Sequence, residues 1–216
     1  MVDEITLHAE HAAVPLGRET LSDRVMEAMG KVPRHEFVPV ELRSYAYADR
    51  PLPIGYDKTI SQPFIVALMT DLLELGGDET VLEIGTGLGY QAAVLAELVT
   101  QVYSVEIIEE LESEARKRLT HLGYANVHTR VGDGCLGWAE AAPFDAVIVT
   151  AAPDLIPPTL IAQLKPGGRM IIPAGASLDS QQLTLVEKDA EGRVNSTELL
   201  PVRFSELESA TQIYHA

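Results

Sequence analysis

The sequence contains few cysteines and few basic residues, and each shortage excludes a class of protein. Its one cysteine, Cys135, has no partner for an internal disulfide, so the fold must form without one. Lysine and arginine number 16 against 32 acidic residues, which gives a net charge of −16. Because this charge repels phosphate groups, we expect neither nucleic acid nor an anionic membrane as a partner.

Long apolar runs are also missing. No stretch approaches the ~20 apolar residues that a membrane-spanning helix needs. The N-terminus, Met1-Val2-Asp3-Glu4, lacks the basic start and the apolar segment of a signal peptide. Apolar residues make up 46% of the chain and charged residues 22%, as in an ordinary globular protein. We therefore expect one cytoplasmic domain, 1–216, that exists as a monomer.

The histidines and the cysteine do not form a pattern that indicates a metal site or a reactive thiol. His8 and His11 lie three residues apart, but no matching set of ligands follows them, so no metal is expected. Cys135 has no histidine or cation close to it in the sequence, which favours a buried structural thiol over a nucleophile.

From residue 80 onward, short apolar strands alternate with helical stretches. This alternation predicts an α/β fold, a Rossmann-like doubly wound and mostly parallel sheet with its ligand at the carboxyl ends of the strands. Two further strand patterns around a turn at 189–192 predict an antiparallel C-terminal hairpin. The expected strands are 80–83, 102–105, 127–130, 146–150, 169–173, 182–187 and 193–201, and the expected helices are 91–98, 108–122 and 157–164.

The first third of the chain has a different pattern. A short polar N-terminus precedes a predicted helix over 21–29, and a second helix is expected from 62 to Gly76. Between them, 33–63 carries five prolines and several aromatic residues, which predicts an ordered loop with short helical turns. Loops of this length are often binding loops.

A glycine-rich motif follows the first predicted strand. Glycines are used where a chain turns tightly and where a ligand contacts the backbone. A dinucleotide-binding motif would have Gly or Ala at position 90, where Tyr90 stands, so the pattern looks instead like the first motif of S-adenosylmethionine-dependent methyltransferases. The acidic residue before the glycines suits a cationic ligand. The alternative is an ordinary strand-to-helix turn. The candidate cofactor-binding residues here are Glu83, Gly85, Thr86, Gly87 and Gly89.

Acidic residues also follow the next two strands. Glu106 lies about 20 residues beyond the glycines, the position from which a carboxylate can accept bonds from both ribose hydroxyls. Asp133 would accept a bond from the adenine amino group, and Gly134 would let the base approach. Three such features at three successive strand ends indicate an S-adenosyl-L-methionine site, with S-adenosyl-L-homocysteine as the product.

Further motifs make the likeness more specific. They are Val32-Pro33-Arg34, Phe37-Val38-Pro39, Leu52-Pro53-Ile54-Gly55 and Thr59-Ile60-Ser61-Gln62-Pro63. With these motifs, the sequence resembles the protein-L-isoaspartate (D-aspartate) O-methyltransferase family from about residue 21 to residue 175. The resemblance implies that the chain methylates the free α-carboxylate of L-isoaspartyl residues in damaged proteins and peptides, the first step of their repair.

The resemblance also implies roles for residues that bind the acceptor. Ser61 would act as the catalytic residue at the reacting carboxylate, with Ile60 and Gln62 beside the substrate, and Ala151 and Ala152 would contact the substrate backbone. Segment 1–78 would then hold the N-terminal helices and the substrate loop, 79–175 the cofactor-binding core, and 176–216 the C-terminal hairpin and tail. An alternative role for Ser61 is to cap the helix that begins near residue 63.

The chemistry needs few catalytic groups, because a carboxylate is ionised at neutral pH and is itself the nucleophile. Two segments depart from the family pattern. Asp57 stands in the substrate loop where many relatives carry Gly or a neutral residue, and Phe204-Ser205-Glu206-Leu207 stands where the family usually has Phe-Val-Pro-Leu. A methyltransferase that acts on another peptide carboxylate is therefore the alternative function. A binding protein that has lost catalysis is disfavoured because Ser61, Glu83, Glu106 and Asp133 are all present.

Overall fold

The structure is a computed structural model that describes residues 1–16, 20–176 and 180–209. Within these residues, seven strands form one sheet: β3 (Thr80–Ile84), β4 (Gln101–Glu106), β5 (Val127–Val131), β6 (Phe144–Val149), β7 (Leu164–Ala174), β8 (Gln182–Lys188) and β9 (Val194–Pro201). The spatial order is β5-β4-β3-β6-β7-β8-β9. Neighbours run parallel from β5 to β7 and antiparallel from β7 to β9. The predicted fold class is therefore confirmed, including the antiparallel C-terminal hairpin.

This strand order creates a ligand crevice at the carboxyl ends of the strands. The chain proceeds from β3 outward to β4 and β5, and then returns to the other side of β3 with β6 and β7. The connections after β3 and β6 therefore leave the sheet in opposite directions. In doubly wound folds the crevice at the carboxyl ends of such strands is the usual place for a ligand.

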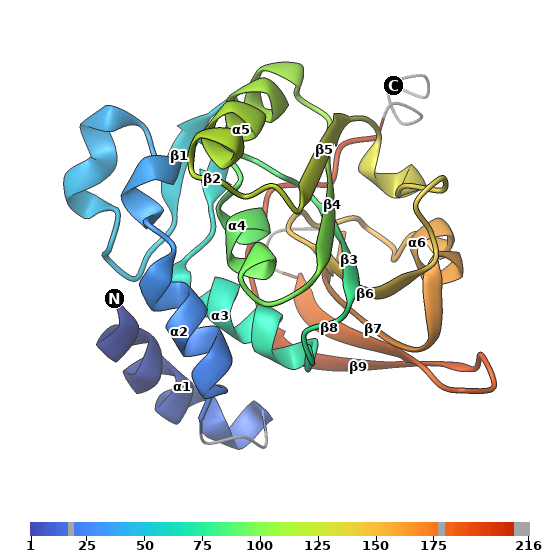
Figure 1. The fold of residues 1–216 in the computed structure, drawn as a ribbon. Coiled ribbons are helices and arrows are strands. Elements are labelled where there is room, and N and C mark those ends of the chain that lie inside the picture. Colours follow the sequence, from blue (N-terminus) through green and yellow to red (C-terminus); the bar gives the residue numbers. More distant parts are fainter. Residues whose placement is uncertain (17–19, 177–179, 210–216) are drawn as a thin grey trace.

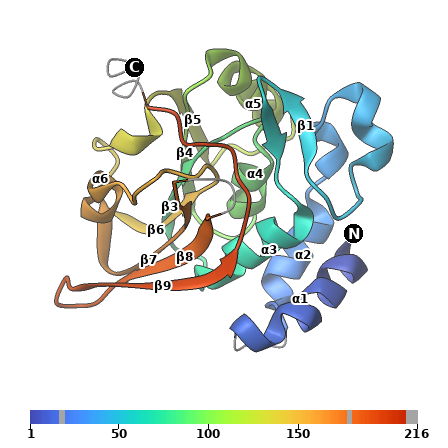
Figure 2. The ribbon, with the colours of Figure 1, turned by 180° about the vertical axis from the view of Figure 1, so that it is seen from behind.

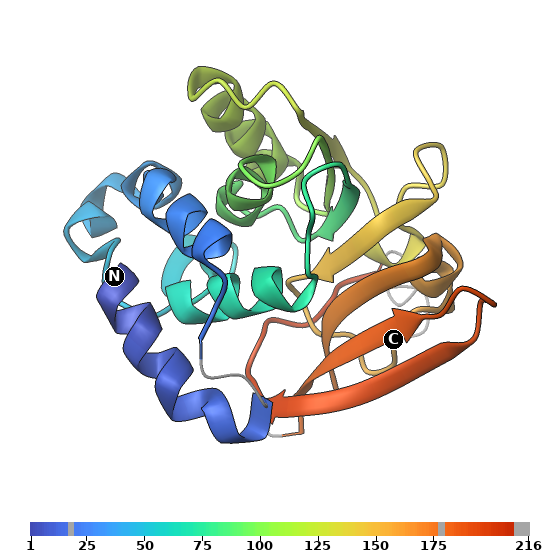
Figure 3. The same cartoon turned by 60° about the horizontal axis from the view of Figure 1, so that its bottom comes forward.

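Both faces of the central strands β3 and β6 are largely buried, as their apolar sequences predict, whereas the edge strand β9 is mostly exposed. On one face, residues such as Val81 and Ile171 pack with α3 (Pro63–Leu72), α4 (Tyr90–Ala96) and α5 (Glu109–His121) (Figure 3). On the other face, the alternate residues Leu82 and Met170 pack with Leu160 of α6 (Pro158–Ala162). Figure 1 shows α4 and α5 on one side of the strands and α6 at the far end of the molecule.

The N-terminal third holds two elements that the sequence did not predict. The polar N-terminus forms α1 (Val2–Leu16), whose Ile5 and Ala9 are buried against the core. The predicted loop contains its short helical turns, η1 (Arg34–Phe37) and η2 (Val40–Tyr45), but it also contains a hairpin of β1 (Leu52–Gly55) and β2 (Lys58–Ile60). The predicted helix at 21–29 appears as α2 (Asp23–Lys31).

The hairpin was missed because its turn residues are atypical. Two-residue hairpin turns of type I′ need φ > 0 at both central positions and usually carry Asn-Gly or a similar pair. Here Tyr56 and Asp57 adopt φ values of 53° and 54°. Asp57, noted above as a departure from the family pattern, is thus an exposed turn residue.

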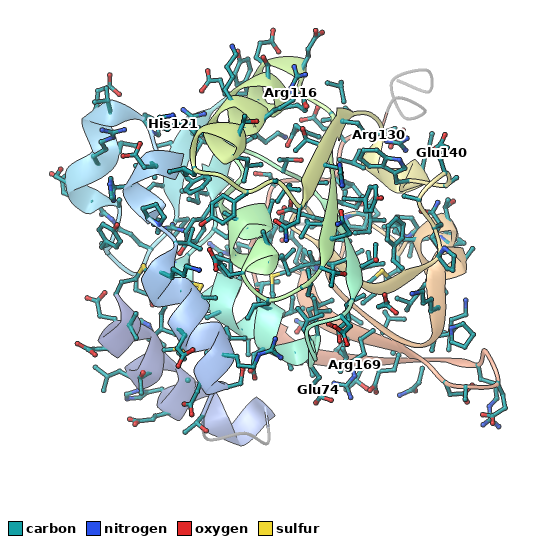
Figure 4. The ribbon with its side chains drawn as sticks, in the orientation of Figure 1. Glu74, Arg116, His121, Arg130, Glu140 and Arg169 are labelled. Atoms are coloured by element: carbon teal, nitrogen blue, oxygen red, sulfur yellow. The ribbon has the colours of Figure 1, made fainter. Side chains whose placement is uncertain are left out.

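One strand is longer than predicted. β7 begins at Leu164 and not at Arg169, because Leu164 already pairs with Phe144 before the register shifts and Arg169 pairs with Ala146. Arg169 also joins two parts of the molecule, since its guanidinium lies 2.8 Å from Glu74 after α3 and 3.1 Å from Glu187 of β8 (Figure 4).

After β9 the chain returns across the carboxyl ends of the strands (Figure 2). We call residues 202–209 the C-terminal segment. Glu206 forms a parallel bridge with Ala152, the third residue after β6. The remainder of the tail, 210–216, lies outside the described residues. Among the described helices, none has the length and apolar character that would let it cross a membrane.

Candidate active site

A cavity of about 550 Å³ lies at the carboxyl ends of the strands. Its walls come from the glycine loop after β3, the end of β4, the connection after β6, the β1–β2 hairpin and the C-terminal segment. The cavity therefore occupies the edge of the sheet that the strand order identifies as the ligand site. The predicted site residues that line it are Ser61, Gln62, Gly85, Gly87, Glu106, Gly134 and Ala151.

The glycine loop turns sharply out of β3. Gly85 has a φ of 96°, and a Cβ atom added there would lie 2.4 Å from Thr150 Oγ1. Thr150 is the residue after β6, and its hydroxyl donates to the carbonyl oxygens of Ile84 (3.1 Å) and Gly85 (2.8 Å). The end of β6 therefore fixes the loop, and only glycine fits at its first position. Gly89 lies beside Leu119 of α5 and does not line the cavity.

Glu106 connects the glycine loop to the end of β4. Its Oε2 accepts a bond from the Gly87 N–H at 2.8 Å, and its Oε1 accepts one from the Ile108 N–H at 3.1 Å. Burial raises the pKa of Glu106, while these backbone donors and the charge of Lys58 act in the opposite direction. Each carboxylate oxygen keeps further acceptor capacity beside the cavity, which suits a ligand with neighbouring hydroxyl groups.

Glu83 lies behind the loop and not in the cavity. Its side chain is fully buried and accepts a bond from Ser104, which is its partner across the β3–β4 pair. Thr86 bonds to the same Ser104 hydroxyl at 2.6 Å. The pKa of Glu83 is raised to about 8, mainly by burial and also by the charge of Glu106, against the lowering effect of the Ser104 bond. Direct contact of Glu83 with a cationic ligand, which the sequence suggested, does not follow from this position.

Asp133 follows β5 but faces the C-terminal segment. Its Oδ1 accepts a bond from the Cys135 N–H at 2.9 Å, and its Oδ2 accepts one from the Ser209 hydroxyl at 2.6 Å. Gly134 lines the cavity and packs so tightly on Ile84 that an added Cβ would lie 2.4 Å from Ile84 Cγ2. Cys135 is half-buried, and burial raises the pKa of its thiol, which disfavours a nucleophilic role.

The predicted acceptor residues divide into two groups. Ser61 and Gln62 line the cavity, whereas Ile60 is buried and lines a small adjoining cavity of about 40 Å³ together with Thr86. Ala151 lines the main cavity. Ala152 does not, because its N–H donates to the Ser205 carbonyl and its carbonyl accepts from the Leu207 N–H, both at 2.8 Å. Its backbone therefore binds the C-terminal segment of the same chain.

Several cavity residues were not predicted as site residues. Lys58 of β2 and Glu208 form an ion pair at 2.5 Å, and both line the cavity, so this pair joins the hairpin to the C-terminal segment. Arg203 and Glu206 line the same wall. Gln181 holds the segment in place, because its side-chain amide exchanges two hydrogen bonds with the Phe204 backbone. The unusual residues at 204–207 were the only sequence signal for this wall.

The comparisons with known proteins agree on one family. The chain matches the family model described as protein-L-isoaspartate(D-aspartate) O-methyltransferase over residues 15–212, which includes the C-terminal segment. It is 65% identical over 210 residues to protein-L-isoaspartate O-methyltransferase 1 of Polaromonas sp. strain JS666, covering 97% of this chain and 89% of that protein.

Two solved structures have the same fold. A protein-L-isoaspartate O-methyltransferase matches with a TM-score of 0.82 and 31% identity over 97% of this chain, which spans 66% of that protein's chain. A Plasmodium falciparum protein, solved in complex with S-adenosyl-L-homocysteine, matches with a TM-score of 0.77 and 20% identity over 95% of this chain and 97% of its own.

Proposed function

This chain belongs to the protein-L-isoaspartate(D-aspartate) O-methyltransferase family, and we propose that it transfers a methyl group from S-adenosyl-L-methionine to the free α-carboxylate of L-isoaspartyl residues in damaged proteins. One observation carries the proposal. Glu106 and the glycine loop, which suit a nucleoside, and Ser61, which suits a carboxylate, line the same cavity of about 550 Å³.

The residues of the cavity fit this cofactor. The Glu106 carboxylate, already oriented by the backbone of Gly87 and Ile108, has the acceptor capacity that two ribose hydroxyls need. Gly85 and Gly87 leave room for a ligand against the backbone. The Glu106 carboxylate beside the loop favours a cationic ligand over a pyrophosphate.

The acceptor needs no general base, because its carboxylate is ionised at neutral pH. The Ser61 hydroxyl donates to one carboxylate oxygen and leaves the other free to attack. The cofactor supplies a methyl group on a sulfonium: the carboxylate oxygen–methyl bond forms as the sulfur–methyl bond breaks, and sulfur keeps the electron pair. The chain contributes mainly alignment of the two reactants and exclusion of water by the C-terminal segment.

The test is methyl transfer from labelled S-adenosyl-L-methionine to a synthetic peptide that contains one L-isoaspartate. The same peptide with a normal aspartate is the control. Transfer to the isoaspartyl peptide alone supports the proposal. If the protein binds S-adenosyl-L-homocysteine but methylates neither peptide, the acceptor is a different carboxylate, and the Glu206 side chain in the cavity wall becomes the first residue to examine.

The proposal includes the setting in which the enzyme works. We place it in the cytoplasm as a monomer that binds isoaspartyl proteins and peptides and uses neither a metal nor nucleic acid. The net charge of −16 supports the exclusion of polyanionic partners. Size-exclusion chromatography with light scattering at several protein concentrations tests the monomer, and a dimer mass at all of them would contradict it.

A further inference from the structure

Two buried charged side chains, Arg34 and Asp49, bind the segment that contains Ser61 and Gln62, and neither lines the cavity. Arg34, the first residue of η1, is fully buried. Its Nε donates to the Ala46 carbonyl at 2.9 Å, and its Nη2 donates to the Ser61 carbonyl at 2.7 Å. The guanidinium thus fixes the backbone of Ser61 relative to the loop that precedes the hairpin.

Asp49 holds the next residues of the same segment. Its side chain is 4% exposed, its Oδ1 accepts a bond from the Phe64 N–H at 2.7 Å, and its Oδ2 accepts one from the Gln62 side-chain amide at 2.9 Å. His8 of α1 also bonds to Oδ2. Phe64 lies in the first turn of α3, where backbone N–H groups lack partners within the helix. Asp49 therefore caps α3 from another part of the chain.

This cap changes what the Ser61 hydroxyl is free to do. A serine shortly before a helix usually bonds to the first free N–H groups, which is the alternative role noted for Ser61. Here Asp49 has taken the Phe64 N–H. In the part of the chain that the structure describes, no hydrogen bond involves the Ser61 hydroxyl, while Ser61 lines the cavity.

We propose that Arg34 and Asp49 are positioning residues for methyl transfer: they bind the backbone and the flanks of Ser61 so that its hydroxyl is left to the acceptor carboxylate. The inference rests on the proposed function. One further contact makes the arrangement rigid. The Arg34 guanidinium lies 4.7 Å from the centre of the Tyr90 ring, and Tyr90 is the first residue of α4, directly after the glycine loop.

The electrostatics agree with a single buried unit. Burial lowers the pKa of Arg34, and the facing Tyr90 and Asp49 act against that shift. An ionised side chain in the interior is tolerated only when fixed partners compensate its lost hydration. If Arg34 moved, its charge would be buried without these partners, which is unfavourable. The segments that it binds, which lead to the cofactor loop and to Ser61, are therefore held in one arrangement.

A double-mutant cycle tests the proposal. The variants are Asp49→Ala and Arg34→Lys, each alone and combined with Ser61→Ala, assayed with the isoaspartyl peptide. We expect each single variant to lower kcat roughly 10–100-fold, the range for small misplacements of a reacting group. In the Ser61→Ala background, each substitution should lower kcat by no more than about twofold, because the effects of substitutions at residues that act through one another are not additive. The Kd for S-adenosyl-L-homocysteine should change by less than about threefold.

Two variants elsewhere serve as matched controls. Arg24 also donates to two carbonyl oxygens, those of Leu75 and Leu98, and Asp145 also accepts a bond from a backbone N–H, that of Thr80. Neither lines the cavity. Arg24→Lys and Asp145→Ala should therefore leave kcat within about threefold of the wild type even where they lower the melting temperature.

The outcomes separate the two proposals. Equal losses of kcat with and without Ser61 would overturn the positioning role, as would single variants with unchanged kcat. If Asp49→Ala does not fold, Asp49→Asn, which keeps an acceptor for the Phe64 N–H, and Arg34→Lys carry the cycle. A wild type that binds S-adenosyl-L-homocysteine but does not methylate the peptide contradicts the proposed function itself, before any variant is made.

Discussion

Replacing Glu106 by glutamine should strongly weaken cofactor binding. In the wild type, both carboxylate oxygens accept backbone N–H groups, from Gly87 at 2.8 Å and Ile108 at 3.1 Å. Glutamine has the same shape but only one oxygen, so its NH₂ group must face one of these two donors. The variant loses one hydrogen bond to a charged acceptor and the charge itself, and the glycine loop loses its tether to β4.

The expected magnitude follows from the bond that a ribose hydroxyl would make to the lost charged oxygen, because the bonds to Gly87 and Ile108 are present without ligand. A hydrogen bond to a charged group contributes about 1.5–3 kcal/mol, and each 1.4 kcal/mol corresponds to about tenfold in Kd. We therefore expect the Kd for S-adenosyl-L-homocysteine to rise roughly 10–100-fold. Isothermal titration calorimetry measures it directly. The product is the better probe, because it has no sulfonium and reports the contacts of the nucleoside half.

A second carboxylate provides the control. Glu112 of α5 is also buried and accepts a bond from the Thr129 hydroxyl at 2.6 Å, but it does not line the cavity. Glu112→Gln should leave the Kd unchanged. Burial raises the pKa of Glu106, so wild-type binding should weaken as the pH falls through this raised pKa and the carboxylate is protonated, whereas Glu106→Gln should lack this dependence. A Kd for Glu106→Gln within about threefold of the wild type would refute this account of the site.

Three further predictions concern stability and catalysis. Burial raises the pKa of Glu83 to about 8, so its protonated form stabilises the fold below about pH 4.5 and this stabilisation is lost as the pH rises through about 8. The free energy of unfolding of the ligand-free protein, measured by urea denaturation, should depend less on pH in Glu83→Gln than in the wild type. An unchanged pH dependence would contradict the raised pKa of Glu83. Gly85→Ala would place a Cβ atom 2.4 Å from Thr150 Oγ1, so it should lower the free energy of unfolding by about 2 kcal/mol more than Gly123→Ala. At Gly123, φ is also positive but no atom lies within 4 Å. Equal melting temperatures of the two variants would contradict this prediction. Ser61→Ala should lower kcat roughly 10–100-fold at nearly constant melting temperature, and an unchanged kcat removes its catalytic role.

The sheet and the cofactor side of the cavity could be predicted because their signals are local. Each strand is a short apolar run, and each loop residue follows a strand end directly. Gly87 and Glu106 are 19 residues apart, yet they belong to the ends of neighbouring parallel strands, which must meet at one edge. Sequence spacing therefore predicts their proximity without knowledge of the packing.

The direction of individual side chains could not be predicted in the same way. Glu83 and Ser104 are partners on adjacent strands, so their side chains lie on the same face and bond to each other inside the core. A shift of one residue in the register of a strand would have placed these side chains on the opposite face of the sheet. The same ambiguity applies to Ala151 and Ala152, of which only the first lines the cavity.

The support behind Ser61 depends on contacts between distant segments. Arg34 lies 27 residues before Ser61, and Asp49 lies 13 before Gln62, with no periodic pattern to link them. A buried arginine in a proline-rich stretch has no signature in the sequence, because its burial depends on which carbonyl oxygens the loops bring to it. The family resemblance marked Arg34 only as part of a motif, and Asp49 carried no signal.

The C-terminal segment explains how the acceptor side can vary while the fold stays constant. The segment is held on the sheet by backbone bonds, from the Leu207 N–H and the Ser205 carbonyl to Ala152, which any side chain permits. The residues that depart from the usual family pattern, among them Glu206, therefore change the chemistry of the cavity wall and not the path of the chain. Among the cofactor-motif residues, Asp133 contacts this segment through the Ser209 hydroxyl. We therefore expect acceptor preference to depend on residues 204–207, which lie outside the cofactor motifs at the strand ends.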